Sequence, residues 1–298
     1  MALNLQKSWL FLALMYLLVN YSTCSNHTLL AKRSNPGRFA PAVATWYGDR
    51  DGAGSGGACG WANDVKSAPF SAMIAAGNAK LFLKGKGCGT CYQVLCTREP
   101  YCSKNSITVT ITDECPGACN NVPFHFDLSG TAFGAMSSPG QADKLRNLGV
   151  VNIQYRRVKC NYGRTKIAFK IDPMVNPYWF AMAVEFCDGD GGLDAVEIGL
   201  NGSKEFRSME NTWGAVWALN IDPSFRGPFS FRLTSRRNEA VLALNAVPHG
   251  FKPGKKSIDR GFLEIEKKDV LVIRSMRNLQ QQEGGHRLHR KFRQRGNQ

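Results

Sequence analysis

An aspartate flanked by aromatic side chains, Asp127, is the residue of this sequence best suited to acid–base chemistry. It stands between Phe124-His125-Phe126 and Leu128-Ser129-Gly130. Apolar neighbours strip water from a charged carboxyl group and so raise its pKa, which a general acid requires. The simpler alternative is that Asp127 caps the turn or the short helix that follows, and residue type alone favours this alternative.

Two further aspartates and two aromatic residues allow related chemistry. Asp113 follows a strand-like segment, and Asp49 stands two residues after Tyr47. Both aspartates could equally be turn formers at strand ends. Trp46 and Tyr47 precede a glycine-rich loop over residues 51–60. Exposed aromatic faces beside such a loop suit sugar rings, although both residues could also be core residues at the start of a strand.

Cysteine spacing indicates disulfides rather than a metal centre. In an exported protein, clustered cysteines form cross-links, and eight of the ten cysteines lie in one part of this chain: Cys59, Cys88, Cys91, Cys96, Cys102, Cys115, Cys119 and Cys160. No second CxxC and no nearby histidine accompany Cys88–Cys91, which disfavours a zinc or redox site. Asp188–Asp194 lacks the full calcium-loop pattern. We therefore predict no metal and no cofactor, and Cys187 as a buried free thiol.

The N-terminus predicts export. Lys7 precedes the apolar run Trp9–Val19, and small residues follow it. This order is typical of a signal peptide, here over residues 1–25, and the run is shorter than the about 20 residues that a membrane span requires. The secretory route makes the glycosylation sequons at Asn26 and Asn201 usable. We expect a secreted protein with no membrane span.

The net charge of +15 first suggests nucleic acid, but its distribution does not. Residues 255–298 hold twelve basic and five acidic residues and so carry +7, while Lys7 adds +1. The remaining charge is spread thinly along the chain, and no nucleic-acid-binding motif is present. A basic secreted body suits acidic wall polysaccharide, or simply solubility, better than DNA.

Alternating apolar residues predict the elements that must position these side chains. In the first region, 39–171, strands are expected at 106–112, 151–155 and 167–171, with a short helix at 141–148. A proline-containing linker is expected at 172–177. Region 178–254 shows the strand spacing of a small β-sandwich. The tail 255–298 is predicted to be disordered apart from one strand at 269–273.

Taken together and in this order, these elements resemble the expansins, and the beta-expansin branch in particular, from about Phe39 to Lys252. The resemblance is carried by TWYG, GGACG, GCGTCYQVLC, ITD, HFDLSGTAFGAM, WGAVW and GPFSFRLTS, which begin at Thr45, Gly56, Gly87, Ile111, His125, Trp213 and Gly227. It implies an all-β fold: a six-stranded double-psi β-barrel, similar to family 45 endoglucanases, followed by an immunoglobulin-like β-sandwich that binds carbohydrate.

The resemblance also implies disulfides and a binding surface. The implied pairs are Cys59–Cys88, Cys91–Cys160 and Cys96–Cys102, and Cys115 and Cys119 are then close enough to pair with each other. Six residues of the first domain would line a polysaccharide-binding groove, and two aromatic residues of the second would continue it, whereas Trp217 would face the core. The expected binding residues are Thr45, Trp46, Tyr47, Asp113, His125, Asp127, Trp179 and Trp213.

The implied function is non-hydrolytic loosening of the plant cell wall, by slippage of noncovalent contacts between cellulose and matrix glycans such as xylan. Two alternatives remain open. Family 45 endoglucanases use an acid and a base; Asp127 matches the acid, and Asp49 falls at the offset of the base. A pure carbohydrate-binding module would need only the aromatic residues of the second domain. We expect a monomer.

The tail 255–298 has no counterpart in the family pattern. It could be a basic arm that tethers the protein to the wall by electrostatic attraction. It could equally be an artefact of translation past the proper end of the chain. The sequence leaves both interpretations open.

Overall fold

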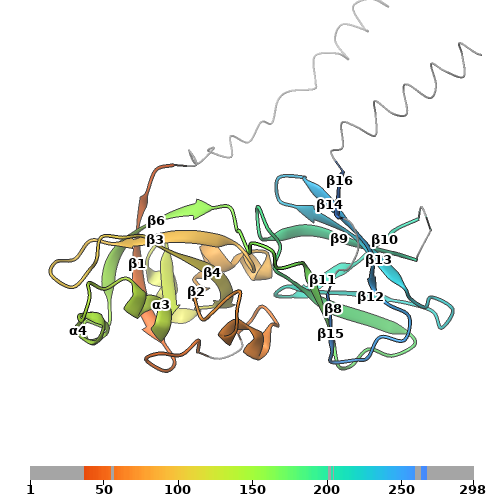
Figure 1. Cartoon of the computed structure of the whole chain (residues 1–298), viewed down its shortest axis with the longest axis horizontal. Helices are drawn as coiled ribbons and strands as arrows, with labels where there is room; N and C mark the ends of the chain where they lie inside the picture. Colours follow the sequence, from red (N-terminus) through yellow and green to blue (C-terminus); the bar gives the residue numbers. More distant parts are fainter. Residues whose placement is uncertain (1–36, 55–56, 201–202, 204, 259–262, 267–298) are drawn as a thin grey trace, which may run out of the picture. The chain divides into compact units, whose positions relative to one another are not determined.

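The computed structural model describes residues 37–54, 57–200, 203, 205–258 and 263–266 (Figure 1). The fold is all-β, as predicted: a closed six-stranded double-psi barrel is followed by two five-stranded sheets. Within these ranges, no helix is long and apolar enough to cross a membrane. The predicted signal peptide, the sequon asparagines Asn26 and Asn201, and the predicted strand at 269–273 lie outside the described residues.

Alternating apolar residues build the barrel. Val109 and Ile111 are fully buried on one face of their strand, and Phe126 and Leu128 do the same on another. The strands follow the order β1-β5-β2-β4-β3-β6. Their bounds are β1 (Ala40–Tyr47), β2 (Ile74–Gly77), β3 (Cys91–Cys96), β4 (Ile107–Glu114), β5 (His125–Ser129) and β6 (Val151–Val158).

Parallel pairing inside the barrel decides which loops meet. β1 pairs with β5 in parallel, and β2 pairs with β4 in parallel, whereas the remaining barrel pairs are antiparallel. Adjacent parallel strands finish at the same edge of a sheet. The segments that leave β1 after Tyr47 and β5 after Ser129 therefore emerge side by side.

Short helices fill the connections of the barrel. The helix predicted over 141–148 is formed as α4 (Ala142–Asn147). Another short helix follows directly from β5, and Ser129 caps it by accepting a hydrogen bond from the amide of Ala132. The helical elements besides α4 are η1 (Ala62–Lys66), α2 (Ala79–Phe82), η2 (Leu83–Gly85), η3 (Gly117–Asn121) and α3 (Gly130–Ala135).

The sandwich encloses an aromatic core between its two sheets, of order β10-β9-β13-β14-β16 and β11-β12-β8-β7-β15. Phe169 stacks on Phe231 with ring centroids 4.7 Å apart, and Phe180 packs against Phe229. The strands are β7 (Ala168–Ile171), β8 (Trp179–Glu185), β9 (Leu193–Leu200), β10 (Arg207–Ser208), β11 (Glu210–Trp213), β12 (Val216–Asn220), β13 (Phe229–Ser235), β14 (Ala240–Val247), β15 (Lys256–Ile258) and β16 (Leu263–Glu266).

Two expectations about organisation need correction. β7 lies inside the predicted first region, 39–171, yet it pairs with β8 and β15 in the sandwich. The predicted linker 172–177 is then the turn of the β7–β8 hairpin, with Asn176 bridged to Trp179. Alternation revealed a strand at 168–171 but could not reveal its partner. The tail, expected to be disordered from 255, instead begins with β15 and continues into β16, which pairs with β14.

Hydrogen bonds and charges join the barrel to the sandwich. The indole nitrogen of Trp61 donates to the carbonyl of Val184 over 3.1 Å. Asp64 of η1 forms ion pairs with Lys170 and Lys256, at 2.8 and 3.3 Å. Lys256 also pairs at 2.6 Å with Glu185, whose side chain is completely buried. A buried carboxylate depends on such partners because its charge is otherwise poorly solvated.

Candidate polysaccharide-binding site

The parallel register of β1 and β5 places Thr45 opposite Asp127. The Thr45 hydroxyl donates to Asp127 Oδ1 over 2.5 Å and lies 2.8 Å from His125 Nε2. A hydroxyl has one proton to give, so when Asp127 is ionised and accepts it, His125 Nε2 is the nitrogen that donates to Thr45. Three predicted site residues therefore form one hydrogen-bonded chain that ends at the Asp127 carboxylate.

Burial shifts both titratable groups of this chain toward their neutral forms. Loss of water raises the pKa of Asp127, and the nearby charge of Asp113 raises it further, while Thr45 and His125 act in the opposite direction. Burial lowers the pKa of His125, partly offset by Asp127. The Asp127 carboxyl thus gains protons at a higher pH than an ordinary aspartate. Capping of α3 falls to Ser129, not to Asp127.

Asp113 serves as an anchor of the glycine-rich loop. Its Oδ1 accepts hydrogen bonds from the amides of Ala58 and Glu114, at 2.6 and 2.8 Å. Asp113 and Asp127 both pair with Ala76, from the strands on either side of β2. Two strand spacings put their backbones roughly 10 Å apart. Asp113 is therefore the second carboxylate of this part of the barrel.

Asp49 occupies a different setting. It is exposed in the loop after β1, and its main-chain carbonyl accepts a hydrogen bond from the amide of Gly52. The neighbouring carboxylate whose charge raises the pKa of Asp127 is that of Asp113. The catalytic pairing of Asp49 with Asp127 stays a prediction.

Strand alternation separates the two aromatic residues of β1. Thr45 and Tyr47 share one face, whereas Trp46 lies on the other with the buried Ala44 and packs against the barrel core. Burial raises the pKa of Tyr47, and the charges of Asp113 and Asp127 raise it further. Tyr47 therefore lies close enough to both carboxylates to feel their charge. Trp46 lies on the opposite face of β1 and packs against the barrel core.

All the implied disulfides are formed: Cys59–Cys88, Cys91–Cys160, Cys96–Cys102 and Cys115–Cys119. The last of these lies beside the site, because Cys115 Sγ is 3.9 Å from Asp127 Oδ2. Sulfur solvates a carboxylate poorly compared with water, so this contact belongs to the burial that raises the pKa of Asp127. Cys187 is free and half-buried.

The sandwich presents its aromatic residues on the sheet that contains β11, β12 and β8. Trp213 is 50% exposed and Trp179 half-buried, while Trp217 is buried as expected. Tyr178, 66% exposed beside Trp179, was not predicted; its position next to Pro177 at a hairpin turn could have indicated it. Trp213 lies against Gly60, where a Cβ atom would be 3.0 Å from its ring. The aromatic residues of the sandwich thus adjoin the loop that Asp113 anchors.

No group of three or more potential metal ligands occurs among the described residues. A cavity of about 870 Å³ lies elsewhere, lined by residues 163–167, 186–193, 233, 235 and 237–241, and it includes none of the predicted binding residues.

Comparisons with known proteins agree with this architecture. Residues 74–155 match the family described as lytic transglycolase, and residues 167–248 match the expansin C-terminal domain. Expansin-B4 of Arabidopsis thaliana is 46% identical over 251 residues, which cover 83% of this chain and 95% of that protein. Expansin-B11 of Oryza sativa subsp. japonica is 48% identical over 220 residues, or 72% of this chain and 75% of that protein.

Solved structures share the fold at lower identity. The apo expansin of Clavibacter michiganensis superposes with a TM-score of 0.56 at 23% identity, over 75% of this chain and 97% of that one. A point mutant of the bacterial expansin, solved in complex with cellohexaose, gives a TM-score of 0.56 at 22% identity over the same shares of the two chains.

Proposed function

We propose, on the premise that this chain belongs to the expansin family and to its expansin-B branch, that it binds cell-wall polysaccharide and loosens the wall without cutting it. The loosening would be a slippage of noncovalent contacts between cellulose and matrix glycans. The relatives that support this proposal cover most of the chain. Secretion to the plant cell wall, with glycosylation at Asn26 and Asn201, is part of the same proposal.

The state of the carboxylates carries the proposal. Asp127 keeps its proton to a higher pH than an ordinary aspartate, because burial raises its pKa. Asp113 has one carboxylate oxygen already engaged by two backbone amides. A general base must be free to accept a proton from water, so Asp113 suits hydrogen bonding to a glycan better than activation of a water molecule.

The aromatic residues supply the rest of the binding surface. Tyr47 contributes from the barrel, and Tyr178, Trp179 and Trp213 contribute from the sandwich. Aromatic faces stack on the apolar faces of sugar rings, and a row of such faces suits a long polymer. Cellulose is the proposed partner, because one structural relative was solved with cellohexaose.

The decisive experiment is constant-load extension of heat-inactivated plant wall strips with the purified mature protein at acidic pH. Prompt creep without release of reducing ends is the expected result. Binding to the wall without creep would reduce the protein to a carbohydrate-binding module. Replacing Asp127 with Asn should remove the pH dependence due to this residue, since the amide mimics the protonated carboxyl at every pH.

The raised pKa of Asp127 also favours a second candidate, an inverting endoglucanase with Asp127 as acid and Asp49 as base. Its test is release of reducing ends from cellulose or mixed-linkage glucan. Release that disappears in Asp49→Asn would replace the non-hydrolytic proposal. Release that disappears only in Asp113→Asn would assign the base to the anchored carboxylate instead.

A further inference from the structure

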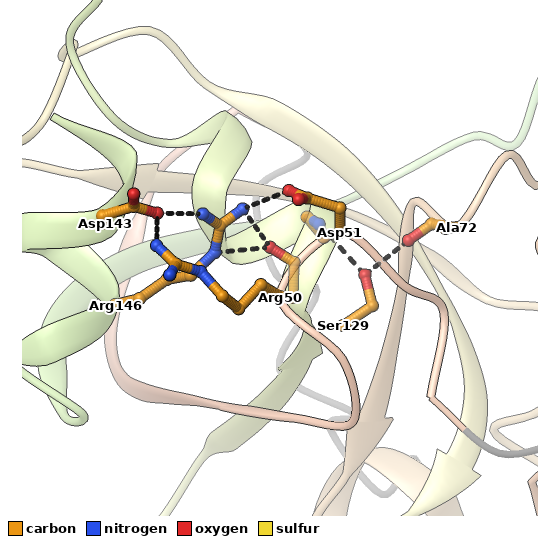
Figure 2. A network of polar contacts seen from close by, with 8 residues as sticks. Arg50, Asp51, Ala72, Ser129, Asp143 and Arg146 are labelled. Carbon is orange, nitrogen blue, oxygen red and sulfur yellow. Dashed lines mark hydrogen bonds and ion pairs between the residues drawn. The ribbon is translucent and has the colours of Figure 1, made fainter. Parts of the chain in front are cut away.

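One buried cation, Arg146 of α4, reaches the edge of the barrel where β1 and β5 end. Its side chain is only 7% exposed. Nε and Nη2 donate to the carbonyl of Gly130 over 3.2 and 3.0 Å. Nη1 donates to Asp143 over 3.0 Å, and Nη2 also donates to Asp51 over 3.2 Å (Figure 2). A single guanidinium thus contacts the start of α3 and the loop that leaves β1.

The main chain of Arg146 makes a third connection. Its carbonyl accepts a hydrogen bond from the indole nitrogen of Trp46 over 3.1 Å. Trp46 lies near the end of β1, just before the loop over residues 48–54. Arg146 therefore contacts β1, the loop after β1 and the helix after β5, which are the segments that the parallel β1–β5 pairing brings together.

Two glycines make room for this arrangement. A Cβ atom at Gly134 would lie 2.2 Å from Arg146 Nη2, and a Cβ atom at Gly130 would lie 2.1 Å from the carbonyl oxygen of Asp49. The amide of Thr131 donates to the carbonyl of Gly52 over 3.3 Å. The loop after β1 is thus pressed directly onto the first turn of α3.

The same loop covers a predicted binding residue. Gly54 adopts a left-handed conformation, with φ of +69°, and a Cβ atom there would lie 2.1 Å from the ring of Tyr47. Displacement of the loop would therefore expose the Tyr47 ring and move Asp49, which the loop carries.

We propose that Arg146 is a positioning residue, which holds the loop over residues 48–54 against α3 and so fixes the predicted binding residue Tyr47, together with Asp49 in the loop itself. The Arg146 side chain is held in place chiefly by the Gly130 carbonyl of α3, since a buried guanidinium that loses its acceptors is strongly disfavoured. The Asp51 contact is weaker because Asp51 is exposed. A loop that is ordered before binding loses less conformational entropy when a polymer arrives. The consequence for binding rests on the function proposed above; the effect on the loop does not.

The test compares Arg146→Lys and Gly134→Ala with a control, Arg50→Ala. Lysine keeps the charge but loses the fork of donors. Gly134→Ala retains the arginine but adds a methyl group that pushes its Nη2 away. The control removes the exposed ion pair between Arg50 and Asp143 in the same network (Figure 2). Hydrogen exchange at the amides of Gly52 and Thr131 reports the loop, and a cellulose-binding isotherm reports the site.

Both test variants should exchange these amides at least about 10-fold faster than the wild type, which corresponds to one charge-assisted hydrogen bond. They should bind cellulose about 5-fold more weakly, the cost of ordering a side chain or two on binding. In alkaline titrations corrected with Tyr47→Phe, Tyr47 should ionise at lower pH than in the wild type, because it is less buried. Arg50→Ala should change each quantity by less than about 2-fold.

Wild-type exchange in both test variants would overturn the positioning role. Faster exchange with unchanged binding and an unchanged Tyr47 titration would show that the loop does not govern the site, and would also overturn it. If Arg146→Lys does not fold, Gly134→Ala decides on the same readouts. If the wild type neither binds cellulose nor loosens walls, the proposed function fails, while the exchange and Tyr47 titration data still decide the role of Arg146.

Discussion

The barrel and the sandwich are stabilised by different means. The barrel holds four disulfides, and polar groups such as His125, Thr112 and Ser129 occupy its buried positions. After Cys160 the chain has a single cysteine, Cys187, which is free, and the sandwich relies on stacked phenylalanines. Buried polar groups contribute less to stability than apolar ones. The part that contains Asp127 is therefore cross-linked, whereas the part with the exposed aromatic residues is held by apolar packing.

The largest effect is expected from a disulfide of the barrel. Replacing both Cys91 and Cys160 with Ser should lower the free energy of unfolding of the barrel by about 4 kcal/mol, because this bridge closes a separation of 69 residues. Calorimetry should show the barrel transition moving while the sandwich transition stays. The matched control is the Cys96–Cys102 bridge, which closes only 6 residues and should cost about 2 kcal/mol. An equal loss in both transitions would mean that the two parts do not differ in this way.

A smaller effect is expected from pH at the charged cluster that joins the two parts. Burial raises the pKa of Glu185 to about 7; Lys256 opposes this shift and Asp64 adds to it. A raised pKa means that the folded state binds the proton more tightly than the unfolded state. Stability from this group is therefore full below about pH 4.5 and is lost as the pH rises through about 7, by up to roughly 3 kcal/mol.

Thermal unfolding of the wild type and Glu185→Gln between pH 4 and pH 8 measures this effect. The wild type should lose stability over this range relative to the variant, whose side chain cannot ionise. Parallel pH profiles for the two proteins would remove the buried carboxyl as a source of pH dependence.

A substitution in the apolar core of the sandwich is expected to lower the free energy of unfolding by about 1 kcal/mol. Ile198 is fully buried there, and Ile198→Val removes one methylene group. Denaturant unfolding should show the loss in the sandwich transition alone. A shift of the barrel transition by the same amount would indicate that the two cores unfold as one unit.

The smallest change in stability is expected at Trp213, although its effect on binding should be clear. Trp213→Ala should alter the free energy of unfolding by less than about 0.5 kcal/mol because the side chain is half exposed. Cellulose binding should weaken by about 1 kcal/mol through lost stacking. Leu244→Ala, an exposed apolar residue of β14 on the other sheet, is the control and should leave binding unchanged.

Much of the fold followed from the sequence because its signals are local. Alternating apolar residues located β4, β6 and β7, and flanking glycines located α4. The resemblance to expansins supplied what local signals could not, namely the barrel topology and the disulfide pairs. The assignment of β7 to the first domain was wrong because alternation identifies a strand without its partner. Strands β15 and β16 were missed because polar residues dominate the segment after 254.

The site was predictable in its residues but not in its geometry. Asp127 was expected to be desolvated by its aromatic neighbours, and burial does raise its pKa. The hydrogen-bonded chain through Thr45 to His125 depends on residues about 80 positions apart in sequence, and only the strand register reveals it. The opposite orientations of Trp46 and Tyr47 follow from alternation along β1 and could have been foreseen. The role of Arg146 has no local signal, because its partners come from three separate segments.

The in-register pairing of β1 with β5 limits how this site can change over evolution. An insertion or deletion of one residue within β1, upstream of Thr45, would turn every later side chain of the strand to the opposite face. Thr45 would then point into the core and lose Asp127. Extra residues after Tyr47 or after Ser129 leave the pairing intact. Variation in specificity is therefore expected as changes of loop length beyond the two strand ends, while the strands themselves keep a fixed length.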